Sequence, residues 1–127
     1  MLDLNAENVC YLIDKARQFH VKEAVTITEA PTSPSDDWAR QVLADHQDDF
    51  SYQELVAAIN DLDPGQQVQL VALMWLGRGD FEKSEWHEAV KVAADSWTDR
   101  TADYLIATPL VADYLSEGLY LFGRSCD

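Results

Sequence analysis

The chain has 127 residues, of which 47% are hydrophobic and 25% are charged. These are ordinary values for a folded globular domain, and they argue against a chain that is disordered throughout. The net charge of −14 repels nucleic acids and anionic membrane surfaces, so we expect direct binding to neither and favour basic partners.

Neither a membrane span nor a secretory signal is predicted. The longest apolar run, from Leu70 to Leu76, is far shorter than the roughly 20 residues that a spanning helix needs. The N-terminal segment contains acids and no base, unlike a signal peptide. We therefore expect a cytoplasmic protein. Cys10 and Cys126 lie near opposite ends of the chain, and in a reducing compartment two free thiols are expected.

The first part of the chain predicts an amphipathic helix followed by an irregular linker. Asn5 can cap this helix, because asparagine side chains accept hydrogen bonds from the first backbone N–H groups. Apolar residues then recur at spacings of three and four, the helical period. They are Val9, Leu12, Ile13, Ala16 and Phe19. Residues 20–35 combine β-branched residues with a stretch rich in Pro and Ser, which predicts an irregular linker within the domain.

The middle of the chain contains the predicted central helix. A short helix over about residues 36–43 and a helix opened by Ser51 and Glu54, which have capping-box spacing, come before it. Asp63 and Pro64 then supply a cap and a proline at the first helical position. Val68–Leu76 is apolar on nearly every side. A helix with no polar face is usually the buried centre of its domain.

The last part of the chain predicts further helices. Gly77 and Gly79 are expected to end the central helix, and the next one runs from about residue 81 or 84 to Trp97, with Trp86 and Trp97 on its buried face. The three tryptophans at 75, 86 and 97 are expected to pack together. A short helix over about residues 99–107 follows.

The final helix is predicted to start at Thr108 and Pro109 and to stop at Gly123. Gly118 lies on its apolar face, where it should permit close approach of a neighbouring helix. That face comprises Leu110, Val111, Tyr114, Leu115, Gly118, Leu119 and Phe122, whereas Tyr120 and Leu121 point away from it. The whole chain, residues 1–127, is thus predicted to form one compact all-α domain of about six or seven short helices around the central apolar helix.

Two sequence stretches carry a resemblance. They are W-L-G-R-G-D at residues 75–80 and R-T-x-x-Y-L-x-x-x-P-L at residues 100–110. With the opening Leu4-Asn5 and the closing residues 123–126, they resemble a family of short bacterial proteins of unknown function. The resemblance implies a bacterial source and a free-standing domain, and it supplies no activity or ligand. The tripeptide at residues 78–80 is also an adhesion motif, but we interpret it structurally: Arg78 pairs with the preceding helix end and Asp80 caps the next helix.

The acidic residues supply the first candidate site. Residues 29–63 contain nine acids and one base, a concentration of charge that would attract a basic partner. We predict that the partner-binding residues are Asp36, Asp37, Asp48, Asp49 and Trp38. His46 and the aspartates around it could ligate a cation, yet their spacing matches no metal-binding loop, so a solvated linker is the favoured interpretation and no metal or other cofactor is predicted.

A second candidate site lies around two predicted helix starts. Arg100, Thr101 and Thr108 could bind an anion or another ligand, because helix N-termini attract negative charge. The alternative is that the threonines and the proline only cap and begin the helices.

Three classes of function stay open. The first is a non-catalytic protein-interaction module, with homo-oligomerisation as one form of it. The second is an acidic mimic that inhibits a nucleic-acid-binding protein. The third is a small-molecule or metal-responsive regulator or enzyme. Neither a nucleophile elbow nor a phosphate-binding loop is present, so the interaction module is favoured over an enzyme.

Overall fold

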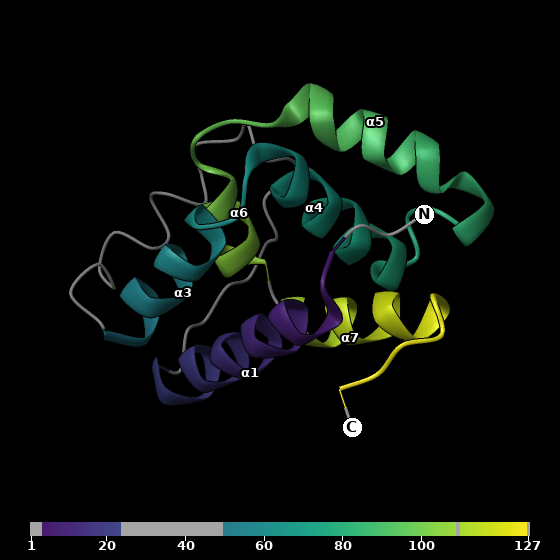
Figure 1. The fold of residues 1–127 in the computed structure, drawn as a ribbon. Helices are drawn as coiled ribbons and strands as arrows, with labels where there is room; N and C mark the ends of the chain where they lie inside the picture. The colour runs from purple at the N-terminus through teal and green to yellow at the C-terminus, as the bar shows by residue number, and fades with distance from the viewer. Residues whose placement is uncertain (1–3, 24–49, 109, 127) are drawn as a thin grey trace.

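The fold is built from helices (Figure 1). A computed structural model describes residues 4–23, 50–108 and 110–126, without the side chains of residues 20–23. Within these ranges the chain forms six α-helices and one 3-10 turn and has no strand, so the predicted compact all-α class is confirmed. The elements are α1 (Ala6–Glu23), α3 (Phe50–Asn60), α4 (Pro64–Arg78), η2 (Lys83–Glu85), α5 (Trp86–Ser96), α6 (Thr101–Ala107) and α7 (Val111–Leu121).

The predicted caps explain where α1 and α4 begin. The Asn5 Oδ1 accepts the backbone N–H of Glu7 at 2.8 Å. Asp63 and Gln66 form a reciprocal capping box around Pro64, which satisfies N–H groups that a helix leaves unpaired at its start. Ser51, by contrast, lies inside α3 and is buried, so the predicted cap there is wrong.

Helix α4 forms the centre of the molecule. It lies between α5 and α7, while α1 packs against α7 and α3, and α3 packs against α6 (Figure 1). Every residue from Leu70 to Leu76 is buried, which confirms the predicted central helix. The five apolar residues of the predicted α1 face are buried as well, as expected for a helix that covers one side of a core.

Two glycines allow α4 and α7 to approach closely. A Cβ atom on Gly118 would lie 2.6 Å from the carbonyl oxygen of Leu73, and one on Gly77 would overlap the carbonyl oxygen of Tyr114. The prediction for Gly118 is therefore confirmed. The prediction that Gly77 ends α4 is wrong, because this glycine lies within the helix. Gly79 ends α4 with a left-handed backbone (φ 95°), a conformation that glycine adopts without steric cost.

Several predicted burial patterns extend past the true helix ends. Trp97 follows α5 and is 38% exposed, and Leu110 precedes α7 and is 59% exposed. Leu110 has a left-handed backbone (φ 61°), so it leaves the helical register of the face to which it was assigned. The tryptophans do not form one cluster: Trp75 stacks on Phe81 and Trp86 meets Phe122 edge-on.

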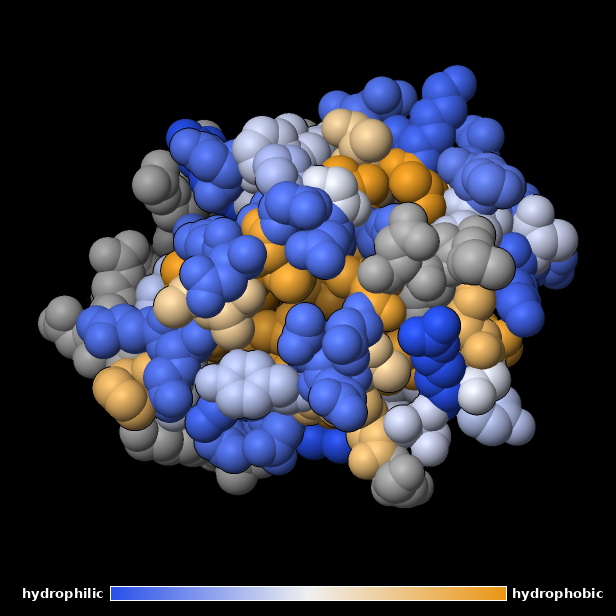
Figure 2. All heavy atoms as spheres, viewed as in Figure 1, coloured by the Kyte–Doolittle hydropathy of each residue, from blue (hydrophilic) through white to orange (hydrophobic). Residues whose placement is uncertain are grey.

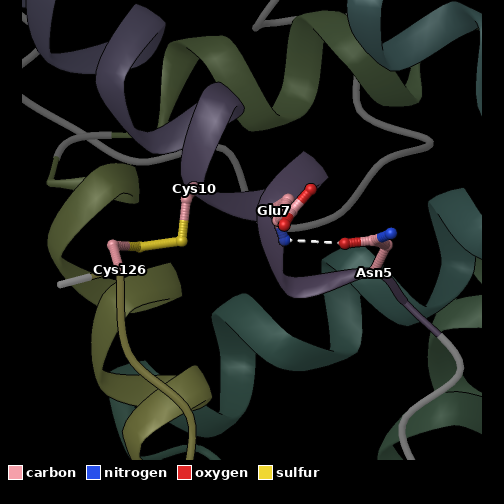
Figure 3. The surroundings of a disulfide bond; sticks show 4 residues. All are labelled: Asn5, Glu7, Cys10 and Cys126. Atoms are coloured by element: carbon pink, nitrogen blue, oxygen red, sulfur yellow. Dashed lines mark hydrogen bonds between the residues drawn. A yellow bond between two sulfur atoms is a disulfide. The ribbon is translucent and has the colours of Figure 1, made fainter.

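The two cysteines form a disulfide bond, which corrects the expectation of free thiols (Figure 3). Cys10 lies on α1 and Cys126 in the tail after α7, 116 residues away in sequence, with Cα atoms 5.5 Å apart. The tail turns back at Gly123 (φ 76°), and the Arg124 backbone N–H donates to the carbonyl oxygen of Leu119 at 2.9 Å. The distance between the cysteines in sequence therefore did not predict whether they pair, because α1 and α7 pack side by side and bring the two ends of the chain together.

Some predictions fall partly or wholly outside the described residues. The predicted helix over residues 36–43 does, as does most of the predicted linker over residues 20–35; of the latter, residues 20–23 continue α1. The extent of the domain and its linker therefore stay predictions. Among the described helices, none is long and apolar enough to cross a bilayer.

Candidate functional site

The two stretches that carry the family resemblance meet in space at Tyr104. The Trp75 Nε1 donates a hydrogen bond to the Tyr104 hydroxyl at 2.7 Å. The Arg78 guanidinium also contacts this hydroxyl and forms an ion pair with Asp80, with 2.7 Å between Nη2 and Oδ2. The sequence prediction was that Arg78 pairs with the end of one helix and Asp80 caps the next; this is wrong, because the two residues pair with each other. The cluster fixes the end of α4 against α6.

Burial controls the ionisation of this cluster. Tyr104 is fully buried, and burial raises its pKa above the ordinary value, although hydrogen bonds from Trp75 and Arg78 partly oppose the shift. Burial is the largest single effect on Arg78 and would lower its pKa, but the hydrogen bonds and electrostatic attraction of Asp80 and Tyr104 together outweigh it, so the net shift is upward. Tyr104 therefore stays a neutral hydroxyl at physiological pH and Arg78 stays a cation.

The three residues of the predicted anion site form hydrogen bonds within the protein. The hydroxyls of Thr101 and Thr108 are buried and donate to the carbonyl oxygens of Thr98 (2.8 Å) and Tyr104 (2.7 Å). Arg100 lies at the start of α6, where its backbone N–H donates to the Thr98 hydroxyl. The two threonines lie at opposite ends of α6. Their role in binding an anion stays a prediction.

Two further polar contacts join helices inside the molecule. Gln67 donates to the carbonyl oxygens of Ile59 and Leu62, and accepts the indole N–H of Trp97 at 2.8 Å. The Tyr52 hydroxyl donates to Asp103 at 2.5 Å. Among the described residues, every buried side-chain nitrogen and oxygen has a hydrogen-bond partner. These interior polar groups therefore stabilise helix packing.

An open site lies on the outside, between α1, α3 and the start of α4. This groove, called the α1–α3 groove below, has a volume of about 310 Å³, near the lower end of the range for small-ligand sites. Figure 2 shows a hollowed apolar surface at the centre of this face, surrounded mostly by hydrophilic residues. The residues that line the groove are Asn8, Tyr11, Leu12, Ala58, Asp61, Leu62 and Gln66.

The groove has an apolar floor and a polar rim. Leu12 is buried, Ala58 and Leu62 are half-buried, and Tyr11 is 48% exposed. At one end, Lys15 lies 5.6 Å from the centroid of the Tyr11 ring and 3.5 Å from the Glu54 carboxylate. An aromatic ring, alkyl surface and carboxylates together can hold a cationic side chain that has an apolar stem.

The sequence prediction missed this groove. Its pattern placed Leu12 in the core, assigned no role to Tyr11 and counted Asp61 only as one of the nine acids of residues 29–63. A tyrosine beside the apolar face of the first helix is the one signal that pointed here, because large aromatic side chains at the edge of a buried face are often partly exposed. The groove depends on how α1 crosses α3, which local sequence does not specify.

The predicted acidic binding residues, Asp36, Asp37, Asp48, Asp49 and Trp38, lie outside the described residues, as does the Asp45–Asp49 segment with His46. Their placement stays a prediction. In the described part of the chain, no group of three or more His, Cys, Asp or Glu side chains could hold a metal ion.

Comparison with known proteins places the helical domain in a family. Residues 52–124 match the family described as "Protein of unknown function (DUF3775)", and the chain belongs to this family. The matched segment covers α3 from Tyr52 through α7, so α1 and both cysteines lie outside it. No curated protein and no solved structure matches the chain.

Proposed function

We propose that this protein is a non-catalytic interaction module that binds a basic protein partner in the cytoplasm. The observation that carries the proposal is the open α1–α3 groove, with its apolar floor and a polar rim that includes the carboxylate of Asp61, on a chain whose net charge is −14. The interior polar groups, in contrast, have partners within the fold.

The charge and the groove would contribute in different ways. A strongly acidic surface speeds encounters with basic proteins, and salt weakens this steering because the screening length is about 8 Å at physiological ionic strength. Contacts in a groove set the lifetime of the complex. The predicted acids Asp36, Asp37, Asp48 and Asp49, with Trp38 as an apolar anchor, belong to this proposal as the steering surface.

The test begins with affinity capture of partners from the native host, followed by mass spectrometry and kinetics with the recovered partner. We expect replacement of the four aspartates by asparagine to lower the association rate and its salt dependence, while the melting curve is retained. An unchanged rate and salt dependence would remove the steering surface from the proposal. Failure to recover any specific partner would contradict the interaction module itself.

The identity of the captured partner separates the alternatives. A nucleic-acid-binding protein whose binding surface is occupied would support the acidic mimic, for which the concentration of acids in residues 29–63 is the motive. A second copy of the chain would support homo-oligomerisation. Specific binding of a small anion that is lost in Arg100→Gln would support the ligand-responsive regulator.

A further inference from the structure

We propose that the α1–α3 groove binds a lysine side chain of the partner, with the alkyl stem on Leu12 and Leu62 and the ammonium group at Asp61. This inference rests on the proposed interaction with a basic protein and names the site and the chemistry of that contact. The sequence prediction placed Leu12 in the core and counted Asp61 among the acids of residues 29–63, but it did not bring the two together in one site.

The floor of the groove suits an alkyl chain. Leu12 and Leu62 come from α1 and from the turn after α3, and Ala58 adds a small apolar surface between them. Lysine carries four methylene groups below its charge, and such stems commonly lie along apolar surface while the charged end stays in water. An acidic side chain would meet the same floor but would be repelled by the rim.

The rim supplies an available carboxylate. Asp61 is exposed, and within the described part of the chain its carboxylate forms no ion pair and no hydrogen bond. Gln66, at the same rim, uses its Oε1 to accept the Asp63 backbone N–H at 3.2 Å. Asp61 is therefore the charged group of the groove that is available to a ligand.

The protein already holds one of its own lysines in this manner beside the groove. Lys15 lies between the Tyr11 ring and the Glu54 carboxylate. Glu54 and Asp61 are seven residues apart, which is about two helical turns, so they follow the same side of α3 and its C-terminal extension. The Asp61 backbone N–H still donates to the carbonyl oxygen of Ala57 at 2.9 Å, which keeps Asp61 in this helical register. Asp61 thus repeats the position of Glu54 without a lysine of its own.

The test compares three short, glycine-rich, acetylated and amidated peptides by NMR titration at low ionic strength. One carries a lysine, the second carries norleucine, which keeps the alkyl chain and removes the charge, and the third carries alanine. We expect the lysine peptide to shift the amide signals of Tyr11, Leu12 and Asp61 in a saturable way. The norleucine peptide should bind about 2- to 5-fold more weakly, the usual range for one exposed ion pair, and the alanine peptide weaker still.

Variants assign the charge contribution to one residue. In Asp61→Asn the lysine peptide should fall to the affinity of the norleucine peptide, whose own binding should not change, because the two substitutions remove the same interaction. Glu117→Gln on α7, an exposed residue outside the groove, removes the same formal charge and should leave the lysine peptide unaffected. Melting curves check that both variants are folded.

Three outcomes would overturn the inference: equal binding of the lysine and norleucine peptides, equal effects of Asp61→Asn and Glu117→Gln, or absence of shifts in the groove. Concentration-dependent groove shifts without peptide would also overturn it, because a second copy would then be the occupant. If a basic partner is nevertheless captured, the proposed function survives and the contact lies elsewhere. If no partner is captured either, both proposals fail.

Discussion

Tyr104 shows how one buried hydroxyl can join two helices. It accepts the indole N–H of Trp75 from α4 and also contacts Arg78, near the end of the same helix. A buried donor left without an acceptor costs more free energy than a formed hydrogen bond contributes. Loss of the Tyr104 hydroxyl is therefore expected to cost more free energy than one hydrogen bond contributes, because the Trp75 indole N–H would stay buried without an acceptor.

We predict that Tyr104→Phe lowers the free energy of unfolding by about 1–3 kcal/mol, because the Trp75 indole N–H then loses its buried acceptor. Urea denaturation followed by tryptophan fluorescence measures the effect. Tyr120→Phe is the matched control, since Tyr120 is 70% exposed. Similar stabilities of the two variants would argue against the role of the Tyr104 hydroxyl in joining α4 to α6.

The raised pKa of Tyr104 also predicts a pH dependence. A group whose pKa is higher in the folded state binds its proton more tightly there, so its contribution is fully present below the unfolded pKa. That unfolded value is about 10 for tyrosine. Stability should therefore fall as the pH rises from about 10 toward the folded pKa, and this part of the fall should be missing in Tyr104→Phe. Denaturation curves at a series of alkaline pH values measure it; identical pH profiles would contradict the prediction.

At the residue scale, the sequence indicated which residues begin and end helices, but not which side chains would contact one another. Asn5, Asp63 and Gly79 have their predicted roles because caps depend on local spacing. Arg78 and Asp80 pair with each other instead, since the left-handed turn at Gly79 brings them together. The contact with Tyr104 joins residues whose proximity is created by packing of α4 against α6, so no local pattern could have indicated it.

At the scale of elements, the crossing of α4 and α7 depends on their glycines. The space that a side chain on Gly118 would need is filled by the backbone carbonyl and side chain of Leu73. Backbone atoms cannot move aside as a flexible side chain can. The two helices must therefore separate if this glycine is replaced, and tightly packed interiors resist such shifts.

We predict that Gly118→Ala destabilises the domain by about 1–3 kcal/mol through overpacking, although alanine is the better helix former by about 1 kcal/mol. Gly65→Ala is the matched control: its Cβ would have the Asp63 Oδ1 as nearest neighbour at 3.4 Å, so the same substitution should leave stability unchanged or slightly higher. Thermal or urea denaturation measures both. An equally stable Gly118→Ala variant would show that α7 can shift at little cost.

The helical period predicted the helices well and their ends less well. The faces of α1 and α4 are buried as predicted because periodicity reports which side of a helix meets the core. Trp97 and Leu110 were assigned to buried faces, but each lies one residue outside its helix. Beyond a helix end the period no longer decides direction, and at Leu110 the positive φ turns the chain outward.

At the scale of the whole molecule, the disulfide connects two cysteines that lie outside the family match. Cys10 is partly buried on α1 and packs against the core, while Cys126 is exposed in the tail. In the described part of the chain, the noncovalent polar contacts of this tail include an Arg124 hydrogen bond to the carbonyl oxygen of Leu4 at 3.5 Å. The bond therefore ties the tail after α7 to the start of α1, whereas the core around α4 is held by packing.

The disulfide bears on the expected compartment. Disulfides persist in oxidising surroundings and are rare in the reducing cytosol, so the disulfide and the predicted cytoplasmic location imply opposite thiol states for Cys10 and Cys126 in the cell. Alkylation of thiols in freshly lysed cells of the native host, followed by mass spectrometry, separates the cases. Blocked, unalkylated Cys10 and Cys126 would place the protein in an oxidising compartment, whereas two alkylated cysteines would support the cytoplasm.

We predict that the purified, air-oxidised protein contains this disulfide and that its loss lowers stability without unfolding the domain. Closing a loop over a sequence separation of 116 residues stabilises by up to about 5 kcal/mol in the chain-entropy description, and measured values are typically about 2–4 kcal/mol. Cys10→Ser should therefore lower the urea midpoint while keeping the helical circular dichroism spectrum, because the buried core does not include the tail. A reductant should lower the midpoint of the parent protein to that of the variant and should not affect the variant itself. If the reductant leaves the parent midpoint unchanged although thiol titration shows complete reduction, the cross-link contributes nothing to stability; if both forms lose their helices, the tail and α1 are required for the fold rather than joined to it.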